Sequence, residues 1–322
     1  MNLRITHRRL YAAAAVAAAA ALAGCGSATG TGSAAASSAA ASGSSFPVTV
    51  TAADGAVTVK ARPARIVSLA PTLTEDLYAV GAGPQVVAVD SDSNYPPGVP
   101  VTKLSGLGPN IEAIARYSPD LVVAFQNAGG LVSGLGKLKV PVLIEPPAAT
   151  LNQAYQEIEQ IGQATGHGAQ AQRVVASMKS QIAADVAHAG SAHRGLRYYW
   201  ELQANPFYSV ASSTFIGQIV SLFGLKDIAD AADKASDGGY PELSQEYIVA
   251  ARPQLIFLAD NAPAYGGQTP ATVAARPGWA AIPAVADHEV IALNDDIASR
   301  WGPRLPQLVE QLAQAVEKAP SP

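Results

Sequence analysis

The sequence predicts an α/β protein made of two Rossmann-like lobes joined by a long, rigid backbone helix. Three observations lead to this prediction. Short, continuously apolar segments alternate with helical segments, which is typical of parallel sheets covered by helices. The alternation stops between residues 151 and 189 and then resumes. A helix–proline–strand unit of the first half also has a counterpart in the second half.

The first half of the chain contains the clearest strand signals. We expect buried strands at 65–69, 85–89, 120–125 and 140–144, separated by helices at 72–80 and 110–117. Thr72 is expected to cap the first of these helices, because Glu75 follows it with the spacing of a capping box. Asn110 is expected to cap the second.

The middle of the chain has no strand signal and carries two apolar helical faces, one on each side of Gly166. We assign a connecting helix to residues 166–190, which would be part of one stiff strut if helix ran unbroken over 151–189. This connector would join an N-terminal lobe, residues 46–165, to a C-terminal lobe, residues 191–322, and would limit motion between them.

The second half repeats the α/β pattern. We expect strands at 196–202, 255–258 and 290–293, with helices near 215–223 and from about 306 to 317. The chain is therefore predicted to end in a helix.

The N-terminus has the layout of a secretory signal. Basic residues precede an apolar stretch at about 10–21, which is shorter than the ~20 residues that a membrane-spanning helix needs. The stretch ends in Leu22-Ala23-Gly24-Cys25, which looks like a bacterial lipobox. Cys25 is the only cysteine, so we expect it to carry the lipid, with 1–24 as the lipoprotein signal peptide. A chance cysteine in an Ala-rich signal is the alternative.

The segment after Cys25 and the charge of the chain define its setting. Residues 25–45 consist almost entirely of Ser, Gly, Ala and Thr, which predicts a flexible tether between the membrane and the folded part. Without its signal peptide the chain would lose three Arg and no acid, so the net charge would move from -4 to -7. An acidic body argues against nucleic acid or anionic lipid as the main partner. We expect a monomer on the extracytoplasmic face of the cell membrane.

Two acids occupy matching places in the repeated unit. Glu112 precedes a proline by seven residues and a leucine by nine, and Glu246 does the same. Each unit is predicted to be a short helix, a proline that ends it and a buried strand. Interaction with the helix dipole, about 0.3–1 kcal/mol, could alone explain both acids. Alternatively, each half presents one acid to a basic pocket of a partner. The two acids would then set orientation more than affinity, because one exposed ion pair contributes about 0–1 kcal/mol.

Several short motifs carry a family resemblance over nearly the whole chain after residue 46. In order they are Arg-Ile-Val-Ser-Leu-Ala-Pro at 65–71, Thr-Glu at 74–75, Tyr-Pro-Pro at 95–97, Asn-Ile-Glu at 110–112, Pro-Asp-Leu at 119–121, Pro-Gly-Trp at 277–279 and Gly-Pro-Arg-Leu at 302–305. Together they resemble the helical-backbone class of periplasmic binding proteins, which serve importers of cobalamin, ferric siderophores and haem. The resemblance implies a binding protein, not an enzyme, with no cofactor besides its cargo. Its partners would be an ABC permease and its ATPase.

Within that class the sequence is most similar to the cobalamin-binding branch. The similar motifs are Ser-Leu-Ala-Pro at 68–71, Tyr-Pro-Pro at 95–97, and Asp296 with Arg300 four residues later and Pro-Arg at 303–304 after it. The resemblance places Glu112 and Glu246 on the acids that dock into arginine pockets of the permease. It also places six residues on ligand-contacting positions: Tyr95, Phe125, Tyr208, Tyr240, Asp296 and Arg300. The sequence departs from the branch at 106–108, where Gly-Leu-Gly stands near an expected Trp, and at Phe125 and Tyr240, where Trp is favoured. These departures are consistent with a wider pocket or a different corrinoid.

The residue types suit a large, flat ligand. Aromatic rings can contact a corrin or porphyrin face, at about 0.5–1.5 kcal/mol per ring pair beyond area burial. Arg300 offers a fork of donors and Asp296 offers acceptors, which together can hold amide groups. Ordinary packing of the tyrosines, and a local ion pair between Asp296 and Arg300, remain the alternatives. Trp301 could either wall the cleft or pack in the core.

Other ligands and functions are less well supported by the sequence. No two histidines fall in the expected cleft loops, which disfavours a bare Zn or Mn ion and haem ligation through His, although Tyr could still bind haem iron. A ferric siderophore or haem remains the alternative cargo. A secreted α/β enzyme is a further alternative. It is disfavoured because the sequence lacks a Gly-x-Ser-x-Gly elbow, a His-Glu-x-x-His pair and a Walker A loop.

Overall fold

The computed structural model describes residues 45–320. The predicted signal peptide, Cys25 and almost all of the predicted tether lie outside the described residues. Among the described residues, no helix combines the length and apolar character needed to cross a membrane. The described chain begins with a hairpin of β1 (Val48–Ala52) and β2 (Gly55–Val59).

The N-terminal lobe is built on a four-stranded sheet in the order β4-β3-β5-β6. All neighbouring strands are parallel. The strands are β3 (Ile66–Ser68), β4 (Val86–Val89), β5 (Leu121–Ala124) and β6 (Val142–Ile144), and the helices around them are α1 (Pro71–Ala79), α2 (Ile111–Ala115) and α3 (Leu131–Lys137). The apolar runs of the sequence thus form a buried parallel sheet, as predicted.

Both faces of this sheet are covered because successive strand residues point to opposite sides. In β5, Leu121 and Val123 join one core with Leu73 of α1. Val122 of the same strand joins a second core with Ile114 of α2. A strand buried on both faces has no alternating polar positions, which explains its continuous apolar sequence.

The C-terminal lobe repeats this design with a parallel sheet in the order β10-β7-β12-β13. Its strands are β7 (Arg197–Glu201), β10 (Lys226–Asp227), β12 (Leu255–Leu258) and β13 (Val290–Ala292). Its helices are α6 (Phe215–Ser221), α7 (Gln245–Ala251), α8 (Pro270–Ala274), α9 (Pro283–Ala286), α10 (Asp295–Ser299) and α11 (Leu305–Lys318). A small antiparallel sheet joins β8 (Gln203–Ala204), β9 (Phe207–Tyr208) and β11 (Glu242–Leu243).

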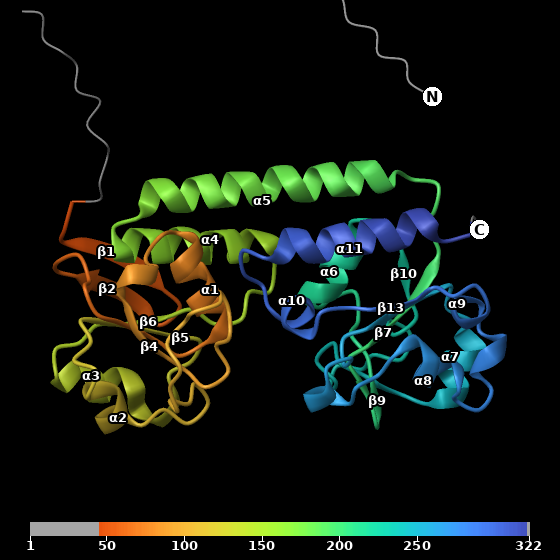
Figure 1. Cartoon of the computed structure of the whole chain (residues 1–322), viewed down its shortest axis with the longest axis horizontal. Coiled ribbons are helices and arrows are strands. Elements are labelled where there is room, and N and C mark those ends of the chain that lie inside the picture. Colours follow the sequence, from red (N-terminus) through yellow and green to blue (C-terminus); the bar gives the residue numbers. More distant parts are fainter. Residues whose placement is uncertain (1–44, 321–322) are drawn as a thin grey trace, which may run out of the picture. The chain divides into compact units, whose positions relative to one another are not determined.

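The region between the lobes is a pair of helices, α4 (Leu151–Thr165) and α5 (Gly168–Ala189). They pack against each other, and α5 also packs against α11 (Figure 1). The possibility of one unbroken strut over 151–189 is therefore wrong. Gly166, with φ +81°, ends α4 in the left-handed conformation that favours glycine, and the chain turns back. The predicted boundaries of the two lobes remain predictions.

The start of α1 differs from the prediction. The helix begins with Pro71 at its first position, and Ala70 is the N-cap without a side-chain hydrogen bond. Thr72 is therefore not the cap, and Glu75 does not complete a capping box. Pro71 starts the helix because its fixed φ suits the first helical position, where its missing N–H has no intrahelical partner to lose. Glu75 is buried in the first turns of α1, which gives it a different role.

The repeated unit of the sequence is confirmed. The helix α2 leads into β5, and α7 leads into β12. Asn110 caps α2, as predicted, by accepting a hydrogen bond from the Ala113 N–H at 2.7 Å. Ser244 caps α7 in the same way, accepting from the Tyr247 N–H at 3.1 Å.

Candidate functional site

A pocket of about 520 Å³ lies between the two lobes. The N-terminal lobe contributes the start of α1, the loop after β4 and the residues just after β5 and β6, and the C-terminal lobe contributes α10 and the two residues after it. The lining residues are Ala70, Pro71, Thr72, Ser91, Asp92, Asn94, Phe125, Pro147, Asp296, Ser299, Arg300 and Trp301. Loops beyond the carboxyl ends of parallel strands are the usual place for ligands in α/β folds.

A buried carboxylate, Glu75, ties two arginines of the C-terminal lobe to α1. Its side chain is 0% exposed and accepts from Arg300 Nη1 at 2.7 Å. Arg304 donates to both of its oxygens, from Nε at 2.7 Å and from Nη2 at 2.5 Å. Charge-assisted, forked hydrogen bonds of this kind are strong and fix orientation. The cluster therefore holds both arginines in place at the cleft.

Arg300 makes further contacts that cross the cleft. Its Nη2 donates to Asp296 at 2.7 Å, and its Nη1 donates to the Asn94 side-chain oxygen at 2.9 Å. The Asn94 amide in turn donates to Asp296 at 2.8 Å. Asn94, Asp296 and Arg300 thus form a closed ring of hydrogen bonds between the loop after β4 and α10. A ligand that enters this pocket meets a polar edge whose charges are already paired.

Trp301 both lines the pocket and packs toward the helices. Its Nε1 donates to Glu157 of α4 at 2.9 Å. Burial, and then the charge of Asp76, raise the pKa of Glu157 well above its ordinary value. Burial similarly raises the pKa of Asp76, with the charge of Glu75 the next cause. Burial and then Asp54 raise the pKa of Glu145 to about 8. The carboxyl groups behind this wall of the pocket are therefore harder to ionise than exposed carboxyl groups.

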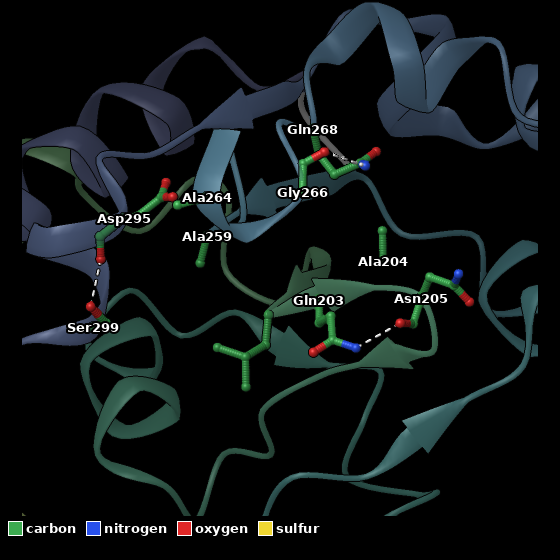
Figure 2. Close-up of a pocket in the computed structure, with 10 residues that line it drawn as sticks. Gln203, Ala204, Asn205, Ala259, Ala264, Gly266, Gln268, Asp295 and Ser299 are labelled. Atoms are coloured by element: carbon green, nitrogen blue, oxygen red, sulfur yellow. Dashed lines mark hydrogen bonds between the residues drawn. The ribbon is translucent and has the colours of Figure 1, made fainter. Parts of the chain in front are cut away.

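A second pocket, of about 670 Å³, lies within the C-terminal lobe (Figure 2). Its walls are the β8–β9 hairpin, the segment after β12, and α10. The lining residues are Leu202, Gln203, Ala204, Asn205, Ala259, Ala264, Gly266, Gln268, Asp295 and Ser299. Ser299 lines both pockets. The helix α10 therefore separates them, with Asp295 facing this pocket and Asp296 facing the other.

The structure brings together three of the six predicted ligand residues. Phe125, Asp296 and Arg300 all line the pocket between the lobes. Tyr95 follows Asn94 and is 37% exposed, with the Arg304 guanidinium 4.2 Å from its ring centroid. One face of this ring is thereby occupied, and Tyr95 does not line either pocket.

The other two predicted tyrosines lie around the small antiparallel sheet. Tyr208 of β9 pairs with Gln203, which lines the second pocket, and with Glu242 on its other side. Because directly paired residues of antiparallel strands share a face, Tyr208 lies beside the Gln203 side chain. Tyr240 is 45% exposed and lies just before β11. Neither tyrosine lines either of these two pockets, so their ligand role stays a prediction.

The departure from the family pattern near residue 106 has a steric basis. A Cβ added at Gly106 would lie 2.2 Å from the Leu69 carbonyl oxygen and 3.2 Å from Phe125 Cε1. No side chain fits there unless the backbone moves. Leu107, next to it, is exposed. Gly106 therefore lets the loop pass close to Phe125, which lines the pocket in place of a larger ring.

Glu112 and Glu246 are both exposed, in the first turns of α2 and α7. Neither has an ion-pair partner among the described residues. In the view of Figure 1 both helices lie away from α5. Each acid also benefits from the helix dipole, so the geometry allows both the dipole explanation and the docking explanation.

Sequence reasoning missed Glu75, Arg304 and Asp295 as site residues. The sequence relates Glu75 only to the start of its own helix and to the Thr-Glu motif at 74–75, whereas its partners are 225 and 229 residues away. Arg304 lies in the Gly-Pro-Arg-Leu motif that carried the family resemblance, which was the available signal. Asp295 could have been noticed only as the neighbour of Asp296.

Comparison with known proteins gives one consistent result. The family model for periplasmic binding proteins matches residues 66–297. The chain is 32% identical, over 84% of its length and 86% of the relative, to an uncharacterised ABC transporter substrate-binding lipoprotein, YvrC, of Bacillus subtilis. It is 31% identical, over 80% of its length and 91% of the relative, to a vitamin B12-binding protein of Pectobacterium atrosepticum.

Solved structures share the fold. The periplasmic haem-binding protein RhuT from Roseiflexus, in its apo form, matches with a TM-score of 0.66 and 27% identity. The match covers 79% of this chain and 97% of that one.

Proposed function

The chain belongs to the periplasmic binding protein family, and on this premise we propose that it captures cobalamin or a related corrinoid for an ABC importer. The vitamin B12-binding relative, similar over most of both chains, supports this ligand. The pocket between the lobes provides the place for it, and the second pocket adjoins that place through Ser299. Each pocket is within the ~300–1,000 Å³ range of sites for drug-sized ligands. A corrinoid is larger than such ligands and would therefore occupy both pockets.

The observation that favours a corrinoid is the charge balance of the cleft. Arg300 and Arg304 share the buried Glu75, and Arg300 also pairs with Asp296. Among the described lining residues of the two pockets no other cation is present. A corrinoid has a periphery of mostly neutral amides, whereas haem has two propionates that need cations. Paired arginines and acids suit amides, which both donate and accept hydrogen bonds.

Aromatic contacts support the same ligand class. Phe125 and Trp301 line the pocket from opposite lobes. Their rings can contact the faces or edges of a macrocycle, while the ring of Asn94, Asp296 and Arg300 holds its polar edge.

Haem is the second candidate, because RhuT has the same fold and is 27% identical. In the part of the chain that the structure describes, none of the histidines lines either pocket, so ligation of haem iron would need a tyrosine. Tyr95, which follows the lining residue Asn94, is one candidate, but the Arg304 guanidinium lies 4.2 Å from its ring centroid. The geometry is thus less suited to haem than to a corrinoid.

Docking to the importer is assigned to Glu112 and Glu246. Both are exposed at the start of short helices that occupy equivalent places in the two lobes. One acid on each lobe would engage a basic pocket of each permease subunit and so set the orientation of the complex. The anchoring of the protein on the extracytoplasmic face is assigned to Cys25, after removal of residues 1–24.

Isothermal titration of the purified protein with cyanocobalamin, and separately with haemin, tests the proposed ligand. We expect saturable binding of one cyanocobalamin and much weaker binding of haemin. Phe125→Ala is expected to weaken cyanocobalamin binding by about three- to tenfold, the loss of one aromatic contact of 0.5–1.5 kcal/mol. Leu107→Ala, at an exposed position outside the pocket, serves as the control. Binding of haemin without binding of cyanocobalamin would refute the corrinoid proposal and support haem as the ligand.

A further inference from the structure

The pocket within the C-terminal lobe carries a polar group that no other described residue fully satisfies. Asp295 lines this pocket and is only 7% exposed. Its Oδ2 accepts a hydrogen bond from the Ala262 N–H at 2.7 Å, whereas its Oδ1 is buried and has no partner among the residues that the structure describes. A buried acceptor without a donor is unfavourable, so a ligand that supplies the donor gains the full benefit.

The facing wall offers further acceptors. Figure 2 shows the Asp295 carboxylate directed toward Ala264, with Gln203 and Asn205 on the other side of the pocket. The Gln203 Nε2 donates to the Asn205 carbonyl at 2.7 Å, which fixes this amide and leaves its Oε1 to accept. The nearby guanidinium of Arg276 is not available, because Glu201 binds it at 2.5 and 2.7 Å.

A second acid lies behind the same wall. Asp260 is fully buried, and in the described part of the chain neither of its carboxylate oxygens has a partner. It lies close to the pocket, since a Cβ added at Gly266 would be 3.8 Å from its Oδ2. Burial, and then the charge of Glu201, raise the pKa of Asp260 to about 7. The surroundings of the pocket are therefore rich in acceptors, and its described lining residues include no cation.

We propose that this pocket is an amide-binding subsite, in which the Asp295 carboxylate, after a rotation of its side chain, accepts a hydrogen bond from a neutral primary amide of the ligand. This inference rests on the proposed function, since a corrinoid carries such amides along its edge. The helix α10 then divides recognition between its two adjacent acids. Asp296, bound to Arg300, serves the pocket between the lobes, and Asp295 serves the pocket inside the C-terminal lobe.

Asp295→Asn tests the subsite with little change of shape. The new side chain can keep its oxygen on the Ala262 N–H, so that its NH₂ group faces the pocket in place of an acceptor. We expect cyanocobalamin to bind at least about tenfold more weakly to this variant in isothermal titration. Asp287→Asn removes the same charge at an exposed position outside the pocket and is expected to bind as the wild type does.

The ligand can be changed as well as the protein. Cyanocobalamin monocarboxylic acids carry a carboxylate in place of one side-chain amide. The wild type is expected to bind one of these acids at least about tenfold more weakly than cyanocobalamin, and Asp295→Asn is expected to remove most of that difference. This comparison needs only the wild type if the variant does not fold.

The outcomes separate the two claims. Binding of cyanocobalamin by the wild type, with equal affinity for the variant and for every monocarboxylic acid, would overturn the subsite and leave the proposed function standing. No binding of cyanocobalamin by the wild type would overturn both.

Discussion

Glu75 is the residue on which the arrangement of the cleft depends most, and Glu75→Gln is the perturbation that tests it. The substitution keeps the size of the side chain and removes its charge. In the wild type, three hydrogen bonds of 2.5–2.7 Å join this carboxylate to Arg300 and Arg304, and its side chain is completely buried. In the variant, two largely buried guanidinium groups would share one neutral amide, half of which is itself a donor.

The expected loss follows from the burial of the cluster. Removal of one partner from a buried ion pair destabilises a protein by about 3–5 kcal/mol, because the remaining charge is left uncompensated. Arg300 keeps Asp296 and Asn94, whereas Arg304 loses its only ion-pair partner among the described residues. We therefore expect the free energy of unfolding to fall by about 3 kcal/mol, a large part of the 5–15 kcal/mol typical of native proteins.

Urea unfolding followed by tryptophan fluorescence measures this loss. Glu112→Gln is the matched control, because it makes the same chemical change at an exposed position and should alter the unfolding free energy by less than about 0.5 kcal/mol. The variant cleft would also carry one more positive charge, so anionic porphyrins should bind more tightly than they do to the wild type. A loss below about 1 kcal/mol, with unchanged porphyrin binding, would refute the reasoning.

Two further predictions concern the buried acids and the docking surface. Burial raises the pKa of Glu145 from 4.5 to about 8, so the folded state holds a proton that the unfolded state has already released between these pH values. Wild-type stability is therefore reduced by up to about 1.4 kcal/mol per pH unit as pH rises through this window, and the reduction is complete above it. Glu145→Gln should be close to the wild type at pH 4 and more stable at pH 8–9 in urea unfolding; a difference that does not vary with pH would contradict this. Glu112→Ala combined with Glu246→Ala should abolish ligand uptake by cells while leaving affinity in titration unchanged, and normal uptake by the double variant would exclude the docking role.

The elements that could be predicted from the sequence are those whose signal is local and continuous. The strand at 255–258 is apolar at every position because it is buried on both faces, and it was predicted with its observed bounds. The Asn110 cap and the paired units around Glu112 and Glu246 could also be predicted, since each depends on spacings of a few residues. The two-residue strands of the small sheet, β8, β9 and β11, carry too few residues to show any periodicity.

The missed parts of the site depend on contacts between distant segments. The sequence around Glu75 is the same whether its carboxylate caps the start of α1 or binds Arg300 and Arg304. The capping role is excluded because Pro71 starts the helix one residue before Thr72. Only the contact of α1 with the segment 300–304, between α10 and α11, brings the two arginines to Glu75. For the same reason the sequence pointed to Asp296 through its spacing to Arg300, but it gave no sign that Asp295 faces a separate pocket.

A crystal structure of the protein with cyanocobalamin bound tests the central claim most directly. The account predicts the corrin between the lobes, in contact with Phe125 and Trp301, with a side-chain amide within hydrogen-bond distance of Asp295 and with Glu75 still binding both arginines. A ligand held outside the cleft, or arginines that leave Glu75 to bind it, would contradict the account.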